Sequence, residues 1–543
     1  MLQDMPSALS ISAMIVVALT TIYLVFWKKL KARLESMKPF EELPMARDSH
    51  FLLGHLGSLG LSFHEQQYRL SVESANEHGQ CGYWLLSQKC VAVSNWQDAR
   101  KIWLNETGKK QPAIVKTHMG HFLGIHNILV VNGREWKVHR NAITRAFLPM
   151  YDVEYQKSMR LVMHDLVKAL KAAVSEKECL KLDMNEVMKM YTLDVFGLCG
   201  MDTDFGCCRS LQPSRFATSF DVLTGELTRR LKRPLDPFCY FYDLPTKQNR
   251  LHAKEFQSIR SFLNEKLRLR RQTMSSENTT GADKTEKEGE KDLLSRLIEG
   301  HLMAKEQLSE DVPDEALTDI IMSLFFAGYE TTSVALTYAL YLLDQHPDVE
   351  EALLEEIQSL GESSLDNKPE DFVYCKAIVM ETLRLYPPAY AVTRNLKKPI
   401  QLSGGFRVPK ETLVLCPIWV LHRKSWPEPE SFRPDRWAQR QKDRRWVERG
   451  QEEEDGDNNN NDESGSGSGT IPAANRKAFF AFTVGGRSCP GASFALQEAV
   501  MILAGLIKNF KFRVEPGYTL CPKQDGVVQH PKGGMPMRVE VRS

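Results

Sequence analysis

The sequence predicts a mainly α-helical protein in which one large domain follows an N-terminal membrane-spanning helix. Residues 8–27 contain no charged side chain, and a long stretch of the chain after residue 49 is dominated by helical periodicity. Within that stretch, residues 313–345 predict a helix that is apolar nearly all round, which is typical of a helix buried in the middle of a large domain.

The composition excludes two other classes of protein. The 543 residues include 70 Lys plus Arg against 69 Asp plus Glu, so the net charge of +1 gives no global basic field for binding nucleic acid. The hydrophobic content of 42% is too high for a disordered chain. The 11 Cys are odd in number and irregularly spaced, which indicates free thiols in a reducing compartment rather than a disulfide framework.

The apolar segment over residues 8–27 is long enough to cross a bilayer as a helix, because a helix of this length rises about 30 Å. Only Asp4 is charged before the segment, whereas four basic residues lie within 28–33 directly after it. The positive-inside rule then places the rest of the chain in the cytosol. A cleaved secretory signal is the alternative, but such a signal has a basic start and a shorter apolar run.

The remaining chain predicts a tether over residues 28–48 and a single domain over residues 49–543. Residues 275–291 are polar and charged, which predicts a solvated loop between helices. Residues 439–470 include EEEDGDNNNNDESGSGSGT and predict a disordered surface insertion, because such a segment cannot bury apolar area. Neither segment separates two self-sufficient cores.

The predicted helix over residues 313–345 carries an unusual centre, AGYETT. Gly328 in a helix interior costs about 1 kcal/mol relative to Ala, and the carboxylate of Glu330 would be expensive to bury without a partner. Ala327 and Thr331 are four residues apart and share one face of the helix, where they leave room for a flat ligand and a small molecule. The alternative is that Gly328 marks a packing contact and that Glu330 reaches solvent.

A second unusual segment, FTVGGRSCPG, occupies residues 482–491 and precedes an amphipathic helical run. Its Gly-rich turn would bring Cys489 to a helix N-terminus, where free N–H groups and the helix dipole favour a thiolate. Arg487 adds a positive charge that suits either a thiolate or a carboxylated cofactor. Zinc would need three or four ligands, and neither CxxC nor HxxxH accompanies Cys489. A single thiolate beneath a macrocyclic metal is the alternative that fits.

These residues together resemble a known family. FTVGGRSCPG has the Phe-x-x-Gly-x-Arg-x-Cys-x-Gly spacing of the haem-thiolate monooxygenases, the cytochrome P450 family, and AGYETT resembles their oxygen-binding helix motif. Glu381 and Arg384 resemble the family's Glu-x-x-Arg pair, and FRPDRW resembles the segment that supplies the third member, Arg436. The motifs extend from Trp136 to Gly491. The resemblance is to the membrane-anchored microsomal type and implies the cytochrome P450 fold, mainly α with small β-sheets.

The resemblance also implies roles for individual residues. Haem b would be the cofactor, and Cys489 would be the axial ligand of its iron. Glu330 and Thr331 would be the catalytic residues, delivering protons while dioxygen is activated. The buried group of Glu381, Arg384 and Arg436 would be structural. The other cofactor-binding residues would be Trp136, Arg140, Ala327, Gly328, Arg394, Phe482 and Arg487, of which Trp136 and the three arginines would contact the haem propionates.

The implied activity is the hydroxylation or further oxidation of a lipophilic substrate. No nicotinamide or flavin fingerprint is present, so electrons are expected from NADPH–cytochrome P450 reductase, with cytochrome b5 as a further candidate partner. A prenyl, terpenoid or fatty-acyl methyl group, oxidised as far as a carboxylic acid, is the favoured substrate class. The expected location is the endoplasmic reticulum membrane, single-pass, with the domain in the cytosol.

Two alternatives stay open at this point: a thiolate-haem isomerase, and a membrane haem-binding protein without turnover. The acid and alcohol of Glu330 and Thr331 favour oxygen activation over both. Two departures from the family's pattern are also notable. MKPFEELPMA replaces the usual Pro-rich hinge after the anchor, and the link between Trp437 and Phe482 is longer than usual.

Overall fold

The computed structural model describes most of the chain from residue 68 to residue 542. Before residue 68 it describes only 20, 23, 24, 27, 28, 31, 40 and 43–46. The residues within 68–542 that lie outside the description are 86–87, 106–107, 109–112, 177–179, 234–240, 280–291, 309–312, 314, 362, 442–444, 449–475 and 526.

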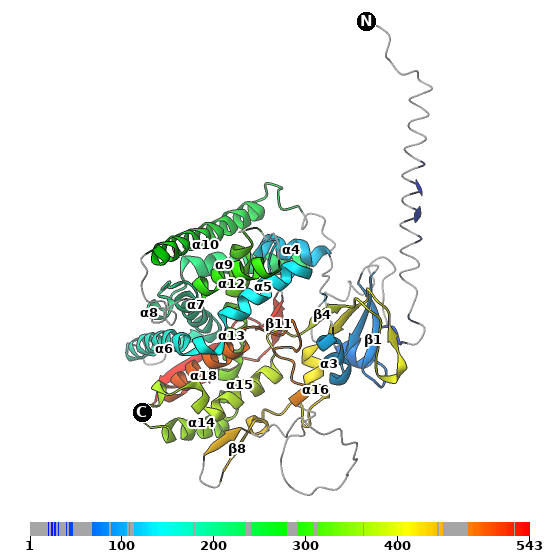
Figure 1. Ribbon diagram of the computed structural model, residues 1–543. Helices are drawn as coiled ribbons and strands as arrows, with labels where there is room; N and C mark the ends of the chain where they lie inside the picture. Colours follow the sequence, from blue (N-terminus) through cyan, green and yellow to red (C-terminus); the bar gives the residue numbers. More distant parts are fainter. Residues whose placement is uncertain are drawn as a thin grey trace.

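The protein combines a large helical body with a smaller β-rich part, which lie side by side in Figure 1. The β-rich part is a four-stranded sheet in the order β1-β2-β7-β4, in which only β2 and β7 are parallel. Helices α3 and α16 pack against this sheet through a shared hydrophobic cluster. The bounds are β1 (Gln80–Leu85), β2 (Gln88–Val93), β4 (Val392–Asn395), β7 (Leu413–Cys416), α3 (Trp96–Asn105) and α16 (Ile418–Lys424).

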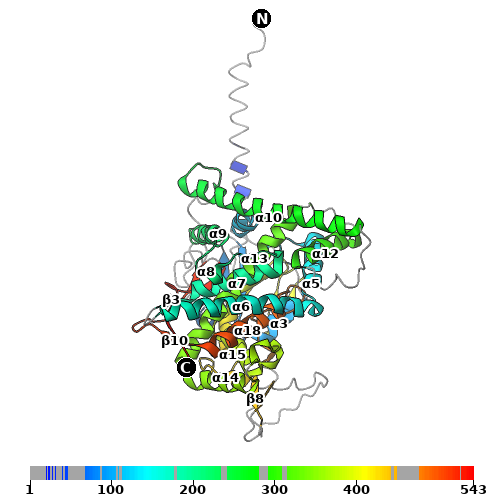
Figure 2. The ribbon, with the colours of Figure 1, turned by 90° about the vertical axis from the view of Figure 1, so that its left-hand side faces the viewer.

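The helical body surrounds one central helix, α13 (Glu315–Gln345), which contacts α7, α15 and α18 among others. Figure 2 shows α10 lying across one end of the body, above α9 and α13. The other helices are α4 (Ala113–Leu123), α5 (Gly133–Ala146), α6 (Asp152–Ser175), α7 (Met184–Met201), α8 (Cys207–Ser210), α9 (Arg215–Leu231), α10 (Lys247–Thr279), α12 (Leu293–Leu308), α14 (Pro347–Ser359), α15 (Val373–Leu385) and α18 (Ala492–Asn509). A mainly helical fold with small sheets is therefore confirmed.

Helix α13 is the buried helix that the sequence predicts, and it begins two residues later than expected, at Glu315. Its side chains are buried on nearly every side, because α7, α15 and α18 cover it. The exceptions near its centre are Ala327, which is exposed, and Gly328 and Thr331, which are partly exposed. One face of this otherwise covered helix is therefore open at Ala327, Gly328 and Thr331.

The remaining strands form small sheets at the edges of the body. Strand β13 (Pro536–Val541) lies between β10 (Phe510–Val514) and β3 (Leu180–Asp183), and β11 (Pro522–Asp525) pairs with β12 (Val528–Pro531) as an antiparallel hairpin. Two further pairs join β5 (Ile400–Gln401) to β6 (Arg407–Val408) and β8 (Ala438–Arg440) to β9 (Trp446–Glu448).

The predicted insertion over residues 439–470 begins later than expected. Strand β8 includes residues 439–440 and pairs with β9 over residues 446–448, so these residues are ordered rather than disordered. The physical reason is a pair of side-chain contacts with α15: Trp446 stacks on Tyr374 with ring centroids 3.9 Å apart, and Glu448 pairs with Lys376. The rest of the predicted insertion lies outside the described residues. The predicted loop over residues 275–291 is likewise corrected at its start, because α10 continues to Thr279.

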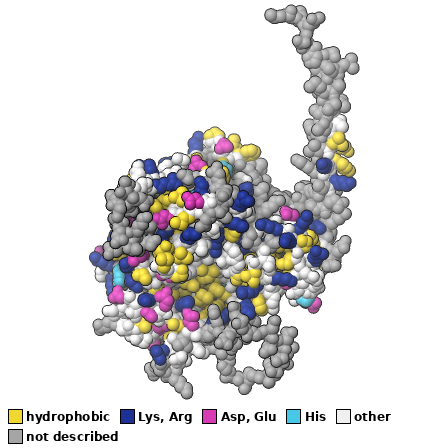
Figure 3. All heavy atoms as spheres, in the orientation of Figure 1, with side chains coloured by type: hydrophobic (Ala, Val, Ile, Leu, Met, Phe, Trp, Pro, Cys, Tyr) yellow, Lys and Arg dark blue, Asp and Glu magenta, His cyan; other side chains and the backbone are white. Residues whose placement is uncertain are grey.

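The predicted anchor over residues 8–27 and the tether over residues 28–48 lie largely outside the described residues. The described residues of the anchor are helical, and the side chains of Tyr23, Leu24 and Trp27 are each more than half exposed. Among the described residues, α13 alone is long and apolar enough to cross a membrane, and most of it is buried within the protein. On the face shown in Figure 3, acidic and basic side chains are interspersed over the helical body.

Candidate functional site

The segment that carries Cys489 is held in a fixed conformation before α18 begins. The backbone N–H of Cys489 donates to the carbonyl of Phe482 at 2.9 Å, which closes the loop on itself. Gly485 has a φ of +78°, and a Cβ atom there would lie 2.2 Å from the carbonyl oxygen of Trp103. Glycine is therefore required at Gly485, both by the left-handed backbone and by the close approach of α3.

The thiol of Cys489 is accessible, although it lies within the interior of the protein rather than on its outer surface. Burial raises the pKa of the Cys489 thiol, while a hydrogen bond from the backbone of Gly491 and the positive charge of Arg140 act in the opposite direction. Arg140 also donates to the carbonyl of Ser488 at 2.5 Å, which ties α5 to the loop. These two groups stabilise a thiolate but do not outweigh burial, so the thiolate form would depend on a further positive partner such as a metal ion.

Arg487 lies against α5 and meets two further arginines. Its guanidinium lies 4.4 Å from the ring centre of Trp136 and donates to Val131 and Asn132 just before α5. Burial, together with the neighbouring positive charges of Arg394 and Arg140, lowers the pKa of Arg487 to about 9. Three cations therefore share one desolvated region, which is unfavourable unless an anion lies among them.

Arg394 reaches the same region from strand β4. Its guanidinium lies 5.0 Å from the ring centre of Trp103, and burial lowers its pKa to about 10. Its Nε is buried and has no hydrogen-bond partner within the described part of the chain. A buried donor without an acceptor is costly, so this atom indicates an acceptor that the described residues do not supply. Carboxylate groups of a bound cofactor fit this donor set.

On α13, the structure gives different surroundings to neighbouring residues of AGYETT. The hydroxyl of Thr331 donates to the carbonyl of Ala327 at 2.5 Å, on the open face of the helix. A Cβ atom on Gly328 would lie 3.2 Å from the ring of Phe196 on α7, so close packing of the two helices accounts for the glycine. The structure therefore supports the alternative explanation for Gly328, while it leaves Ala327 and Thr331 on the open face.

Glu330 does not reach solvent, which corrects one of the expectations stated for it. Its side chain is 1% exposed, and its Oε2 lies 3.0 Å from Nε2 of His530 on strand β12. The buried carboxylate thus gains a partner from a strand two hundred residues further along the chain. Nothing in the local sequence around His530 indicates this contact.

The structure brings together the three residues proposed to stabilise the fold. Arg384 binds both oxygens of Glu381, at 2.8 and 2.9 Å, and Nε of Arg436 lies 3.1 Å from Glu381 Oε1. Sequence reasoning missed Trp437, whose indole N–H donates to Glu381 Oε2 at 2.9 Å. All four side chains are almost wholly buried. The arrangement satisfies the carboxylate from both sides and links α15 to the segment after α16.

His422 connects this buried group to the Cys489 segment and was also missed. Its Nδ1 lies 3.0 Å from the carbonyl of Arg384, and its Nε2 accepts the backbone N–H of Phe480 at 2.9 Å. Because a backbone N–H can only donate, His422 must be neutral with its proton on Nδ1. Burial lowers the pKa of His422 to about 3. A histidine in the run LHRKSWPEPE gives no sequence signal for this role.

We expect His422 to make stability depend on pH in the acidic range. Its pKa is lowered in the folded state, so its contribution is complete above the unfolded value of about 6.5 and is lost as the pH falls towards about 3, by about 1.4 kcal/mol per pH unit. His422→Gln keeps a donor and an acceptor but cannot titrate there. The unfolding temperature, followed by circular dichroism from pH 7 to pH 5, should therefore fall less steeply in His422→Gln than in the wild type. Parallel curves would contradict this assignment.

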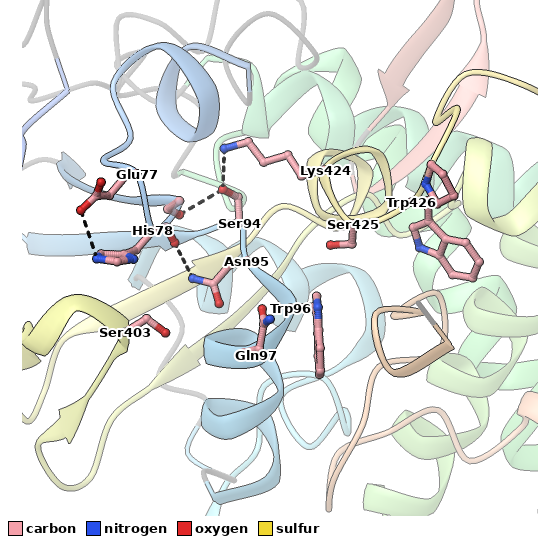
Figure 4. Close-up of a pocket in the computed structure, with 12 residues that line it drawn as sticks. Glu77, His78, Ser94, Asn95, Trp96, Gln97, Ser403, Lys424, Ser425 and Trp426 are labelled. Atoms are coloured by element: carbon pink, nitrogen blue, oxygen red, sulfur yellow. Dashed lines mark hydrogen bonds and ion pairs between the residues drawn. The ribbon is translucent and has the colours of Figure 1, made fainter. Parts of the chain in front are cut away.

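A separate cavity of about 730 Å³ lies in the β-rich part of the protein, shown in Figure 4. Its lining comes from the ends of β1 and β2, the start of α3 and the end of α16. Lys424 donates to Ser94 Oγ at 3.2 Å and to the carbonyl of Ser71 at 2.8 Å, so the ammonium group at this cavity already has acceptors. None of the motif residues lines this cavity, and we assign it no part in the function.

Comparison with known proteins gives a single family. The family model described as Cytochrome P450 matches residues 44–537. The chain is 26% identical to Cytochrome P450 4F3 of Rattus norvegicus over 97% of this chain and 94% of the rat protein. It is 25% identical to Cytochrome P450 monooxygenase sphH of Aspergillus fumigatus over 90% of this chain and 88% of the fungal protein. Cytochrome P450 3A29 of Sus scrofa is 35% identical over 41% of this chain and 39% of its own length.

Proposed function

The chain belongs to the cytochrome P450 family, and from that premise we propose that it oxidises a lipophilic small molecule with electrons from a separate NADPH-dependent reductase. Membership makes the protein an oxidoreductase that uses haem b. The observation that best supports the proposal is the meeting of Cys489, an accessible interior thiol, with the desolvated cations of Arg140, Arg394 and Arg487. That donor set suits a metal macrocycle with carboxylate substituents.

The residues that would hold the cofactor come from four separate elements. Cys489 would bind the iron, while Trp136, Arg140, Arg394 and Arg487 would hold the carboxylates. Haem b supplies the activation of dioxygen, from which one oxygen atom enters the substrate and the other leaves as water. Phe482, Ala327 and Gly328 complete the proposed cofactor set, although the packing of Gly328 against α7 supports it least.

The chain's own contribution to oxygen chemistry is proton delivery from α13. Thr331 has its hydroxyl on the open face of the helix, and Glu330 stands next to it with a partnered, buried carboxylate. A positioned alcohol and acid can pass protons inwards while bulk water stays excluded. This pair is what favours a monooxygenase over an isomerase or a haem protein without turnover.

The substrate that we propose is a prenyl, terpenoid or fatty-acyl chain oxidised at a methyl group, as far as a carboxylic acid. Aromatic side chains dominate where α4 and α9 approach α13: Phe122 contacts Phe220 and Phe326 with ring centroids 5.7 and 5.1 Å apart. These rings are buried, and an apolar neighbourhood of this kind beside α13 suits an apolar substrate. A spin-state titration against a panel of lipids and terpenoids, with products identified by mass, would name the substrate.

We expect Thr331→Ala to separate oxygen reduction from product formation. The substitution removes one hydroxyl and little volume, so haem binding and the substrate-induced spin shift should persist. With a supplied reductase, NADPH consumption should continue, while product falls by about tenfold or more and the two electrons appear in hydrogen peroxide. Both quantities are measured against NADPH consumed.

The matched control is Thr337→Ala on the same helix, because the Thr337 hydroxyl also donates to the carbonyl four residues earlier, at 2.7 Å. It should leave the ratio of product to NADPH unchanged. A Thr331→Ala enzyme whose product still matches its NADPH consumption would show that Thr331 only packs, and the isomerase and the haem protein without turnover would have to be reconsidered.

We propose that the domain over residues 49–543 faces the cytosol from the endoplasmic reticulum membrane, held by a single-pass helix over residues 8–27. NADPH–cytochrome P450 reductase, with cytochrome b5 as a second donor, is the partner that this location would supply. A chain lacking residues 1–33 should leave the membrane fraction at least in part and keep its haem, since the anchor contributes no ligand. Loss of haem from the soluble, folded truncation would argue against this arrangement.

A further inference from the structure

The carboxylate of Glu330 has a partner that its own helix does not provide. His530 lies on β12, the second strand of the C-terminal hairpin, and its Nε2 is 3.0 Å from Glu330 Oε2. The hairpin is itself anchored, because the backbone N–H of Gln529 donates to the carbonyl of Pro388 at 3.1 Å. The imidazole therefore lies within ion-pair distance of the carboxylate, on a strand whose backbone is hydrogen-bonded to the segment after α15.

Lys189 on α7 also interacts electrostatically with Glu330. Lys189 lies 3.2 Å from Asp221 and 3.6 Å from Glu186. Burial alone would lower the pKa of Lys189, but the carboxylates of Glu330, Asp221 and Glu186 outweigh burial and raise it. Lys189 therefore keeps its proton at neutral pH and acts on Glu330 only as a fixed positive charge.

Lys189 and His530 thus differ in what they can do, while the carboxylate of Asp221, which also interacts with Glu330, opposes the ionised form. A permanently charged lysine favours the ionised form of a nearby carboxylate but does not hand over protons. Imidazole, by contrast, is the side chain that generally gains and loses a proton near neutral pH. The His530 side chain keeps 11% of its surface exposed, against 1% for Glu330, so it is the more accessible member of the pair.

We propose that His530 is a positioning residue that also passes protons from solvent to Glu330. In each transfer the proton leaves Nε2 of the imidazolium for Oε2 of the carboxylate, and water then returns a proton to the imidazole. No electron moves in this step. The inference rests on the proposed proton delivery by Glu330 and Thr331, and it extends that route from the helix to the C-terminal hairpin.

The test compares His530→Gln with the wild type and with His78→Gln in the full-length haem-loaded protein. Glutamine keeps an N–H donor for Glu330 but cannot exchange protons near neutral pH. His78 is a matched control, because it also lies beside a glutamate, Glu77, at 3.5 Å, but in the β-rich part. His530→Asn is prepared in parallel in case His530→Gln fails to fold.

We expect His530→Gln to bind haem and substrate as the wild type does, with KM unchanged. Product per NADPH should fall by roughly tenfold with a matching rise in hydrogen peroxide, and the solvent deuterium isotope effect on product formation should increase. His78→Gln should change none of these quantities. Product coupling and an isotope effect equal to the wild type in His530→Gln would overturn the proposal, and so would a rise in KM without loss of coupling.

A second readout needs no turnover. Diethyl pyrocarbonate modifies accessible imidazoles, and mass spectrometry of peptides gives the rate at His530 in the resting protein. That rate should be several-fold higher in Glu330→Ala than in the wild type, while the rate at His78 in the same digest stays constant. Equal rates at His530 would show that the pair does not form in solution.

The two levels of proposal fail in different ways. If Thr331→Ala and His530→Gln both stay coupled, proton delivery from α13 is wrong and the proposed function falls with it. If Thr331→Ala uncouples the enzyme and His530→Gln does not, the proposed function stands and only the role of His530 is overturned.

Discussion

Replacing Cys489 with Ser should abolish the thiolate-type absorption of the reduced, carbon-monoxide-bound protein. A serine hydroxyl is nearly the same size as the thiol, so the loop closed by the Phe482 carbonyl should keep its shape. The alcohol cannot give the electron donation that a thiolate gives to iron, and monooxygenation should fall to background. Absorption spectra of the reduced protein with and without carbon monoxide give the measurement.

Cys521→Ser is the matched control, since Cys521 is the other exposed cysteine among the described residues. Its spectrum should equal that of the wild type. The remaining described cysteines are buried, and burial raises the pKa of thiols such as Cys199 and Cys416, which keeps them neutral. An unaltered carbon-monoxide spectrum in Cys489→Ser would remove the basis for assigning this cysteine to the iron.

The parts of the site that the sequence predicts are those whose residues lie close together in the chain and form short patterns. Helix α13 follows from its unbroken apolar run, and the loop before Cys489 follows from closely spaced glycines followed by an amphipathic helix. Glu381 and Arg384 lie one helical turn apart, so their pairing is also a local property. In each case the residues that act together lie within ten positions of one another.

The parts that could not be predicted depend on contacts between distant segments. His530 lies two hundred residues after Glu330, and His422 joins two segments that no shared periodicity relates. Neither histidine stands in a pattern that distinguishes it from a surface residue. The late start of the predicted insertion has the same cause, because strand β9 is fixed by the stacking of Trp446 on Tyr374, seventy residues earlier.

Glu498 shows a case in which the sequence carried a usable signal. It is a lone carboxylate in the apolar run of α18, and its side chain is 2% exposed. Burial raises the pKa of Glu498 well above its usual range, and a hydrogen bond with Thr332 of α13 partly opposes this effect. A buried acid on an apolar helix face is expensive without a partner, so its presence predicts a polar contact with a neighbouring helix.

Removing the charge of Glu381 should have the largest effect on folding. Glu381→Gln leaves the buried guanidinium groups of Arg384 and Arg436 without their counter-charge. Breaking a buried ion pair in this way typically costs about 3–5 kcal/mol, which is a large part of a domain's total stability. We therefore expect the variant to be recovered in low yield and to lack most of its haem, because His422 and the Cys489 segment are held through the same region.

The control for this prediction is Glu448→Gln, which breaks an exposed pair with Lys376 on the same helix, α15. Exposed pairs contribute only about 0–1 kcal/mol, so haem content and unfolding temperature should stay near the wild type. The measurement is the ratio of haem absorbance to protein, together with the unfolding temperature by circular dichroism. A Glu381→Gln protein with full haem content and wild-type unfolding temperature would mean that Trp437 and the backbone carbonyls around Arg384 suffice to hold the arginines, and that the carboxylate is not what fixes α15 to the Cys489 segment.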